Sequence, residues 1–254
     1  GYGSMIRLRL PAVWLIVLLF SYCSGYWKIL TAVFIMMSLH ECAHVAAACA
    51  VGYRTEGIDV FPFGLCARIS AVGHGNVYRE LCILVAGPCV HLLYPLFIRL
   101  LISADVISKP FADYLIQMNC SMLFFNLLLI LPLDGGRILS SLLHLLFPYA
   151  LAQRITLIIS FATIAVLPVS GYMANAAGWI TLAVLLLQEI VRWQGQLEDR
   201  LEFYRYRLHH PYKGPVCIHD HHDLYRMRTN YLHFGNKSVP EKEWLKQLFH
   251  VTDI

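Results

Sequence analysis

Long apolar runs constrain the fold of this 254-residue chain more than any other feature of its sequence. A helix that crosses a bilayer needs about 20 predominantly apolar residues. Charged residues make up only 14% of the chain, against about 25% in soluble domains. The apolar runs that approach or exceed the spanning length are 10–23, 29–52, 79–103, 112–147, 151–170 and 174–193. The sequence therefore predicts an all-α polytopic membrane protein with six transmembrane helices.

The distribution of lysine and arginine predicts the orientation of these helices. Positive charge gathers before the first run, between the second and third, at Arg154 between the fourth and fifth, and in the tail after Arg192. The opposite side offers only Lys28, Arg99 and Lys109. Because cytoplasmic loops carry an excess of lysine and arginine, both termini are expected in the cytoplasm.

The same pattern divides the chain into regions. Residues 1–4, before Met5, resemble a remnant of expression cloning, and residues 5–194 form the expected membrane domain. Residues 195–254 form a short cytoplasmic tail, expected to begin as a charged helix and to become irregular from Pro211. The tail contains eight acidic residues, which argues against a nucleic-acid partner.

A polar segment between the second and third runs is too interrupted to span a membrane. Short extended pieces on either side of Pro62, Phe63 and Gly64 predict a small membrane-associated β-hairpin. Proline and glycine at this point favour an edge, a bulge or a turn over a central strand.

The second apolar run contains the sequence His40-Glu41-Cys42-Ala43-His44. Histidines four residues apart share one helix face and bind one zinc ion, and the intervening glutamate acts as general base. His40 lies about 15 Å along the predicted helix, at 1.5 Å per residue. Ionisable side chains at this depth are costly and mark functional sites. We therefore predict that His40 and His44 are zinc ligands and that Glu41 is the catalytic base.

A catalytic zinc usually has three protein ligands, so a third is expected elsewhere at membrane depth. Asp134 fits, because Pro132 and Gly135-Gly136 break the helical pattern around it and let the backbone approach a metal. Glu80 and Asp105 are weaker candidates near helix ends. In the third run, His91 is interpreted as a packing histidine held by hydrogen bonds, and Ala86-Gly87 as a site of close helix contact.

Together these motifs resemble the site-2 protease family of intramembrane metalloproteases, and most closely its sporulation branch, the stage IV sporulation protein FB type. The resemblance rests on the histidine motif in one helix and on Asn126, eight residues before Asp134-Gly135, in another. Further matching motifs, in the same order, are Pro62-Phe63-Gly64, His74-Gly75-Asn76, Ala86-Gly87-Pro88 and Pro132-Leu133-Asp134-Gly135-Gly136.

The resemblance implies that His40, His44 and Asp134 bind one Zn²⁺, that Glu41 is the base, and that Asn126 positions water or substrate. It implies that the hairpin with Pro62, Phe63 and Gly64 pairs with an extended substrate. The branch cleaves a late sigma-factor precursor, of the pro-sigma-K type, in the mother-cell membrane around the forespore of a spore-forming bacterium. Membrane partner proteins hold it inactive.

The chain departs from the family in two places. Leu129 stands where the family commonly has proline, and the tail does not match the nucleotide-sensing CBS domain that the sporulation branch often carries. Two alternatives remain open. One is a site-2 protease that clears signal-peptide remnants or an anti-sigma factor, and the other is a membrane protein that only binds or transports metal.

Overall fold

The computed structural model describes residues 22–53, 55–61, 64–69, 73–170, 176–220, 222–234 and 237–249. The predicted first transmembrane helix lies almost entirely outside the described residues, and so do Pro62 and Phe63. The chain divides into two compact units, of which the first contains residues 1–72 and 79–127. The second contains residues 73–78 and 128–254.

Within the described part of the chain, four helices are long and apolar enough to cross a membrane. They are α2 (Trp27–Ala50), α3 (Val77–Ser103), α6 (Tyr149–Val166) extended by the 3₁₀ turn η1 (Leu167–Ser170), and α7 (Ala176–His209). The expected run 112–147 is divided into α4 (Lys109–Asn126) and α5 (Asp134–Leu146), as the break predicted around Pro132 requires. The prediction of a helical membrane protein is thus confirmed, whereas the count of six spans stays a prediction.

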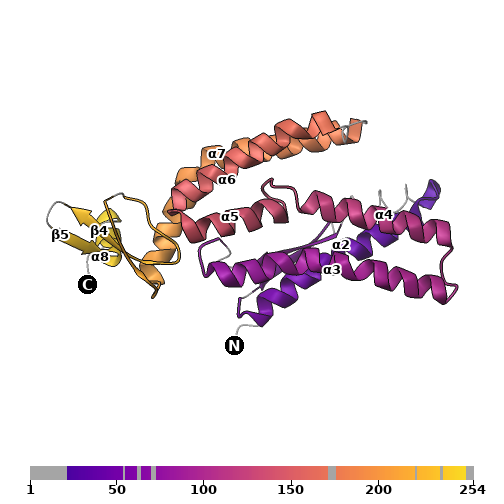
Figure 1. Cartoon of the computed structure of the whole chain (residues 1–254), viewed down its shortest axis with the longest axis horizontal. Helices are drawn as coiled ribbons and strands as arrows, with labels where there is room; N and C mark the ends of the chain where they lie inside the picture. Colours follow the sequence, from indigo (N-terminus) through magenta and orange to yellow (C-terminus); the bar gives the residue numbers. More distant parts are fainter. Residues whose placement is uncertain are drawn as a thin grey trace. The chain divides into compact units, whose positions relative to one another are not determined.

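The first unit contains α2, α3 and α4 (Figure 1) and the strands between α2 and α3. Several polar side chains of its helices are buried, among them His40, His91 and Asn119. Its apolar core includes Met36, whose backbone carbonyl accepts a 2.8 Å hydrogen bond from the hydroxyl of Tyr94 on α3. Large apolar side chains of α3 point outward, with Leu92 67% and Leu93 64% exposed. This reversal of the usual burial pattern is typical of helices whose surroundings are lipid.

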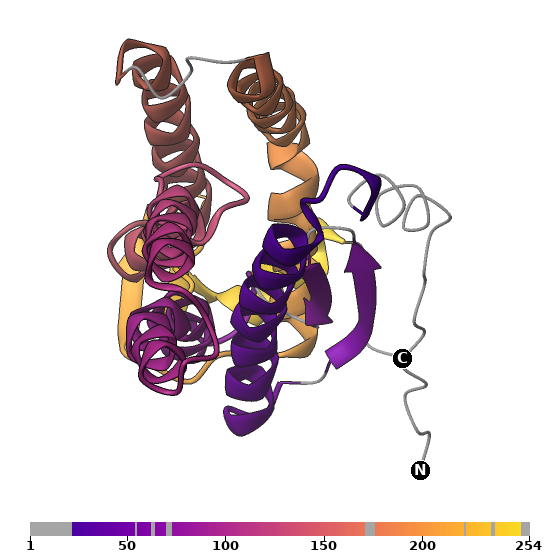
Figure 2. The ribbon, with the colours of Figure 1, turned by 90° about the vertical axis from the view of Figure 1, so that its right-hand side faces the viewer.

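Between α2 and α3, strands β1 (Thr55–Phe61) and β2 (Gly64–Ile69) pair antiparallel. The pairing brings Phe61 opposite Gly64 and continues to Thr55 opposite Ile69. Figure 2 shows the two strands beside α2, which contacts β2. The location of this hairpin at the membrane remains a prediction.

The second unit contains the helical pair α6 and α7, which run antiparallel side by side (Figure 1). Both helices also carry exposed apolar side chains, such as Ile158 at 57% and Leu187 at 62%. α7 has 34 residues and continues without a break through position 194, the predicted end of the membrane domain.

The tail is more ordered than the sequence predicted. Beyond Pro211, strands β3 (Val216–His219), β4 (Thr229–Phe234) and β5 (Lys237–Pro240) form a sheet in that order, and helix α8 (Glu241–Leu248) follows. β3 is parallel to β4, and β4 is antiparallel to β5. The protein is mostly helical, as predicted, but the prediction of a tail that is irregular from Pro211 was wrong, because strands of four to six residues carry too little alternation to be recognised.

A buried ion pair joins the end of α7 to the start of α8. The guanidinium of Arg207 donates to both carboxylate oxygens of Glu241, at 2.6 and 2.8 Å, and to the backbone carbonyls of Arg226 and Arg228. Asn230 on β4 donates a further 2.8 Å hydrogen bond to Glu241. Each nitrogen of the Arg207 guanidinium has at least one acceptor, as a buried charge requires.

Removing one charge of this pair is expected to unfold the tail. Arg207→Ala leaves the carboxylate of Glu241 buried without its cation, which costs about 3–5 kcal/mol. We expect added protease to cut the variant rapidly between residues 210 and 249. Gel electrophoresis and mass spectrometry of the fragments measure the rate and the positions of the cuts. Lys242→Ala, which removes an exposed cation next to Glu241, is the control and should leave the digestion pattern unchanged.

Candidate metal centre

One face of α2 carries the histidine motif into the interior of the first unit. Met36, His40, His44 and Ala48 follow one another at intervals of four residues, and all four are buried. Residues four apart lie on one face of a helix. His40 is 2% exposed and His44 is 5% exposed, while Glu41 is half-buried beside them.

A backbone carbonyl of α3 determines the tautomer of His44. Nδ1 of His44 lies 2.7 Å from the carbonyl oxygen of Ile83. A carbonyl only accepts, so Nδ1 carries the proton and donates it. Nε2 of the neutral ring is then left with its lone pair, which is the state that a metal ligand needs.

The ring nitrogens of the two histidines converge. Nε2 of His44 lies 3.0 Å from Nε2 of His40, and the ligand atoms of His40, Glu41 and His44 all lie within 4.8 Å of one another. A tetrahedral zinc bound by two imidazoles at about 2.0–2.1 Å needs its nitrogens at this kind of separation. The side chains of α2 therefore fit a zinc ion.

Gly87 of α3 lies against the metal-binding edge of both rings. A methyl group at position 87 would lie 2.6 Å from Cε1 of His44 and 2.7 Å from Cε1 of His40, and it would overlap Nε2 of His44. Only glycine therefore leaves the space beside Nε2 open. The sequence indicated close packing at this position, and the structure adds that the packing partners are the two histidines.

Asp134 lies in the second unit, as the first residue of α5, and it is 7% exposed. The backbone before it is held in two ways. Gly136 packs so closely on Ile130 and Leu131 that a Cβ atom would overlap their backbone, and the amide of Leu131 donates a 3.2 Å hydrogen bond to the hydroxyl of Ser160. Gly136 thus permits a tight approach of one backbone segment to another, whereas an approach of this segment to a metal stays a prediction.

Comparison with known proteins gives three relatives, two of which are named as zinc metalloproteases. The chain is 30% identical over 147 residues to stage IV sporulation protein FB of Bacillus subtilis, a match covering 58% of this chain and 51% of the relative. It is 24% identical over 182 residues to a zinc metalloprotease of Methanocaldococcus jannaschii, covering 70% and 51%. A putative zinc metalloprotease of Synechocystis is 31% identical over 121 residues, or 45% of this chain and 31% of the relative. The chain is thus similar to a sporulation protein and to two proteins named as zinc metalloproteases.

The chain spans about half of the length of these relatives or less. No family model matches it. A solved structure of the site-2 protease from Methanocaldococcus jannaschii has a TM-score of 0.49 and 23% sequence identity, covering 78% of this chain and 93% of that one. The names of the relatives agree with the resemblance to the sporulation branch and with zinc as the cofactor.

The structure brings together His40, Glu41 and His44 of the predicted site-2 protease centre. Asn126 is half-buried at the last position of α4, and Gly64 begins β2. The roles of Asp134 as third ligand, of Asn126 beside the metal and of Gly64 at a substrate edge remain predictions.

A second layer of polar side chains backs the histidine pair. His91 on α3 has its ring centroid 5.1 Å from that of His40. Its Nδ1 donates over 2.7 Å to Oδ1 of Asn119 on α4, and Nδ2 of Asn119 donates over 3.0 Å to the carbonyl of His91. The hydrogen bonding predicted for His91 is confirmed, whereas its partner Asn119 was missed because nothing in the sequence connects α3 to α4.

A further buried carboxylate was also missed. Glu189 of α7 is 0% exposed, within a helix apolar enough to span the membrane. It lies close to the end of the expected run 174–193. A charged residue in that position is ordinarily interpreted as the border of a membrane helix, so the sequence did not single it out. Glu189 is thus a second buried carboxylate of the unit that contains Asp134.

Adding a methyl group at Gly87 is expected to expel the metal. In Gly87→Ala the new Cβ overlaps Nε2 of His44, so a ring must rotate away from the position that binds zinc. Overpacking a buried site costs about 1–3 kcal/mol. If this cost opposes zinc binding, the zinc affinity falls by roughly 10- to 100-fold. Competition with a chelating dye measures this affinity. Gly195→Ala on α7, where a Cβ meets no atom within 4 Å, should bind zinc as the wild type does.

Proposed function

We propose that this protein is an intramembrane zinc metalloendopeptidase that hydrolyses a peptide bond of a membrane-associated protein. The observation that supports this most strongly is the buried group of His40, Glu41 and His44 on an apolar helix, with its ligand atoms within 4.8 Å. Two imidazoles and a carboxylate beside them are the parts that a zinc protease needs.

Each side chain of the centre has one task in this proposal. When bound, zinc supplies a Lewis acid that polarises the scissile carbonyl and makes a water molecule acidic. Glu41 takes a proton from the attacking water and later delivers it to the nitrogen of the leaving amine. The carbonyl of Ile83 keeps His44 in the tautomer whose Nε2 binds metal. Asp134 is the proposed third ligand, and Asn126 orients water or substrate.

The substrate must reach the centre with its backbone extended, because a helix uses its own carbonyls and amides in internal hydrogen bonds. Addition to the edge of a small sheet supplies replacement partners. The β1–β2 hairpin has such an edge. We propose that Gly64, at the start of β2, and the preceding Pro62 and Phe63 take part in substrate binding.

Similarity to stage IV sporulation protein FB supports a sigma-factor precursor, of the pro-sigma-K type, as the substrate. On this proposal the protein lies in the mother-cell membrane around the forespore, with both termini in the cytoplasm, and inhibitory membrane proteins regulate it. The alternative within the enzyme class is clearance of signal-peptide remnants or cleavage of an anti-sigma factor. A metal transporter is less well supported, because a glutamate next to the two histidines is arranged for catalysis.

Co-expression of the wild-type protein with tagged candidates tests the proposal. The candidates are a sigma-factor precursor, an anti-sigma factor and a signal-peptide remnant, each followed by gel for a shorter product. We expect cleavage of the sigma-factor precursor alone, lost on addition of a membrane-permeant zinc chelator. Cleavage of another candidate would support the proposed protease activity and replace the proposed substrate. A zinc-loaded protein that cuts none of them would favour the binding-only alternative.

A further inference from the structure

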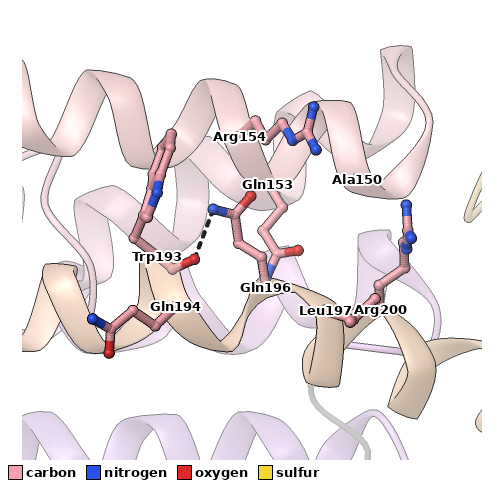
Figure 3. Close-up of a pocket in the computed structure, with 8 residues that line it drawn as sticks. All are labelled: Ala150, Gln153, Arg154, Trp193, Gln194, Gln196, Leu197 and Arg200. Carbon is pink, nitrogen blue, oxygen red and sulfur yellow. Dashed lines mark hydrogen bonds between the residues drawn. The ribbon is translucent and has the colours of Figure 1, made fainter.

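Two adjoining cavities lie along the groove between α6 and α7 in the second unit. The first has a volume of about 390 Å³, and Arg154, Gln153, Trp193, Gln194, Gln196 and Arg200 line it (Figure 3). The second has a volume of about 380 Å³ and is lined by Ile158, Phe161 and Ile190. Trp193 and Gln194 line both cavities, so the two form one continuous groove.

The first cavity is built for an anion. It has two guanidinium groups, Arg154 from α6 and Arg200 from α7, and neither forms an ion pair with any other residue that the structure describes. Nε of Arg200 is buried and lacks a hydrogen-bond acceptor among the described residues. Asp199 does not line the cavity, and its carboxylate accepts a 2.7 Å hydrogen bond from Gln153.

The side chains of the first cavity are held in place by their own helices. The guanidinium of Arg200 lies 6.0 Å from the ring centroid of Tyr204, one turn further along α7. The amide of Gln196 donates a 3.0 Å hydrogen bond to the carbonyl of Trp193, which leaves the amide oxygen of Gln196 able to accept (Figure 3). The cavity therefore offers two cationic groups and several amides, which match a phosphate with hydroxyl groups beside it.

The second cavity continues the groove toward the apolar part of both helices. On α6, Arg154, Ile158 and Phe161 follow at intervals of four and three residues, and therefore lie on one face. Phe161 lies about 10 Å further along the helix than Arg154, at 1.5 Å per residue. Its ring packs edge-on against Trp193, with centroids 6.1 Å apart. The groove thus changes from cationic to apolar over about a third of the thickness of a bilayer core.

We propose that this groove binds an anionic phospholipid. Its phosphate lies between Arg154 and Arg200, and one acyl chain lies along Ile158, Phe161 and Ile190. Trp193 stands between the two parts, at the level where tryptophan favours the border of headgroups and acyl chains. The cytoplasmic leaflet carries anionic lipid, and basic pockets between membrane helices bind its headgroups. The site is independent of the metal centre.

Lipid titration of the purified full-length protein, read by native mass spectrometry, tests the proposal. The probes are phosphatidylglycerol and phosphatidylcholine with identical acyl chains. We expect the wild type to prefer phosphatidylglycerol. In Arg154→Gln/Arg200→Gln the affinity for phosphatidylglycerol should fall on the order of 30-fold, which is the loss expected for two arginines near a lipid surface. Arg192→Gln/Arg205→Gln removes the same charge from α7 outside the groove and should change the affinity by less than about threefold.

Three results would overturn the proposal. They are equal binding of the two lipids by the wild type, an equal loss in the two double variants, and displacement of phosphatidylglycerol by soluble glycerol phosphate. The last result would show a site for a free phosphate ester. If the glutamine variant does not fold, Arg154→Lys/Arg200→Lys keeps the charge, and the proposal requires it to retain the preference for phosphatidylglycerol.

Discussion

Replacing Glu41 with glutamine is expected to abolish peptide cleavage while the protein keeps its zinc. The amide keeps the size of the side chain and cannot take a proton from water. Loss of a general base lowers the rate by about 10²- to 10⁴-fold. Product formation from a co-expressed substrate measures the activity, and elemental analysis of the purified variant measures the metal.

The neighbouring residue provides the control for this prediction. Cys42 follows Glu41 on α2 and is exposed, away from the buried histidine face. Cys42→Ala should keep both the zinc and the cleavage. If Glu41→Gln still cleaves at the wild-type rate, the assignment of the base is wrong, and another carboxylate must take the proton.

Replacing Asp134 with asparagine is expected to remove the zinc itself. An amide oxygen carries no charge and binds Zn²⁺ more weakly than a carboxylate. Because loss of a residue that only supports a ligand costs 10- to 100-fold in metal affinity, loss of a ligand should cost more than about 100-fold. Zinc per chain after dialysis against a weak chelator measures the effect.

Two further variants decide between the possible ligands. Asp113→Asn removes an exposed acid from α4 and should leave the zinc in place. Glu189→Gln removes the buried carboxylate of α7. If zinc is lost from Glu189→Gln and retained in Asp134→Asn, the third ligand comes from α7, and the motif around Asp134 has another purpose.

The part of the centre that the sequence could predict depends on local geometry. His40 and His44 share a helix face whatever surrounds them, because the helical repeat alone determines this. The end of α4 before Pro132 and the close packing of Gly136 on the backbone of Ile130 and Leu131 are also local features. Proline and glycine cause them by acting on the nearest residues.

The contacts between helices could not be predicted in the same way. The carbonyl of Ile83 that orients His44, the packing of Gly87 on both rings, and the Asn119–His91 pair all depend on how α2, α3 and α4 pack. A single sequence shows which residues of a helix are apolar, but it does not show which other helix packs against them. Glycine in an Ala-Gly-Pro motif was the available signal, and it indicated close packing without naming the partner.

The tail was mispredicted for a related reason. Its core joins Phe203 and Tyr204 of α7 to Leu224, Leu232 and Leu245, residues separated by up to about forty positions. On the part of α7 that lies in the tail, Tyr204 is buried, whereas Leu197 is 57% exposed. Short strands that are stabilised by a distant ion pair leave little periodic pattern in the sequence.

Reconstitution of the purified protein with its proposed substrate tests the central claim most directly. The zinc-loaded protein and a sigma-factor precursor are combined in one detergent micelle preparation, and the masses of the products are measured. The account predicts two fragments whose masses sum to the precursor plus one water, from a cut at a single peptide bond within or beside the membrane segment. An intact precursor in the presence of zinc-loaded wild-type protein, with membrane extracts still able to cleave it, would contradict the account.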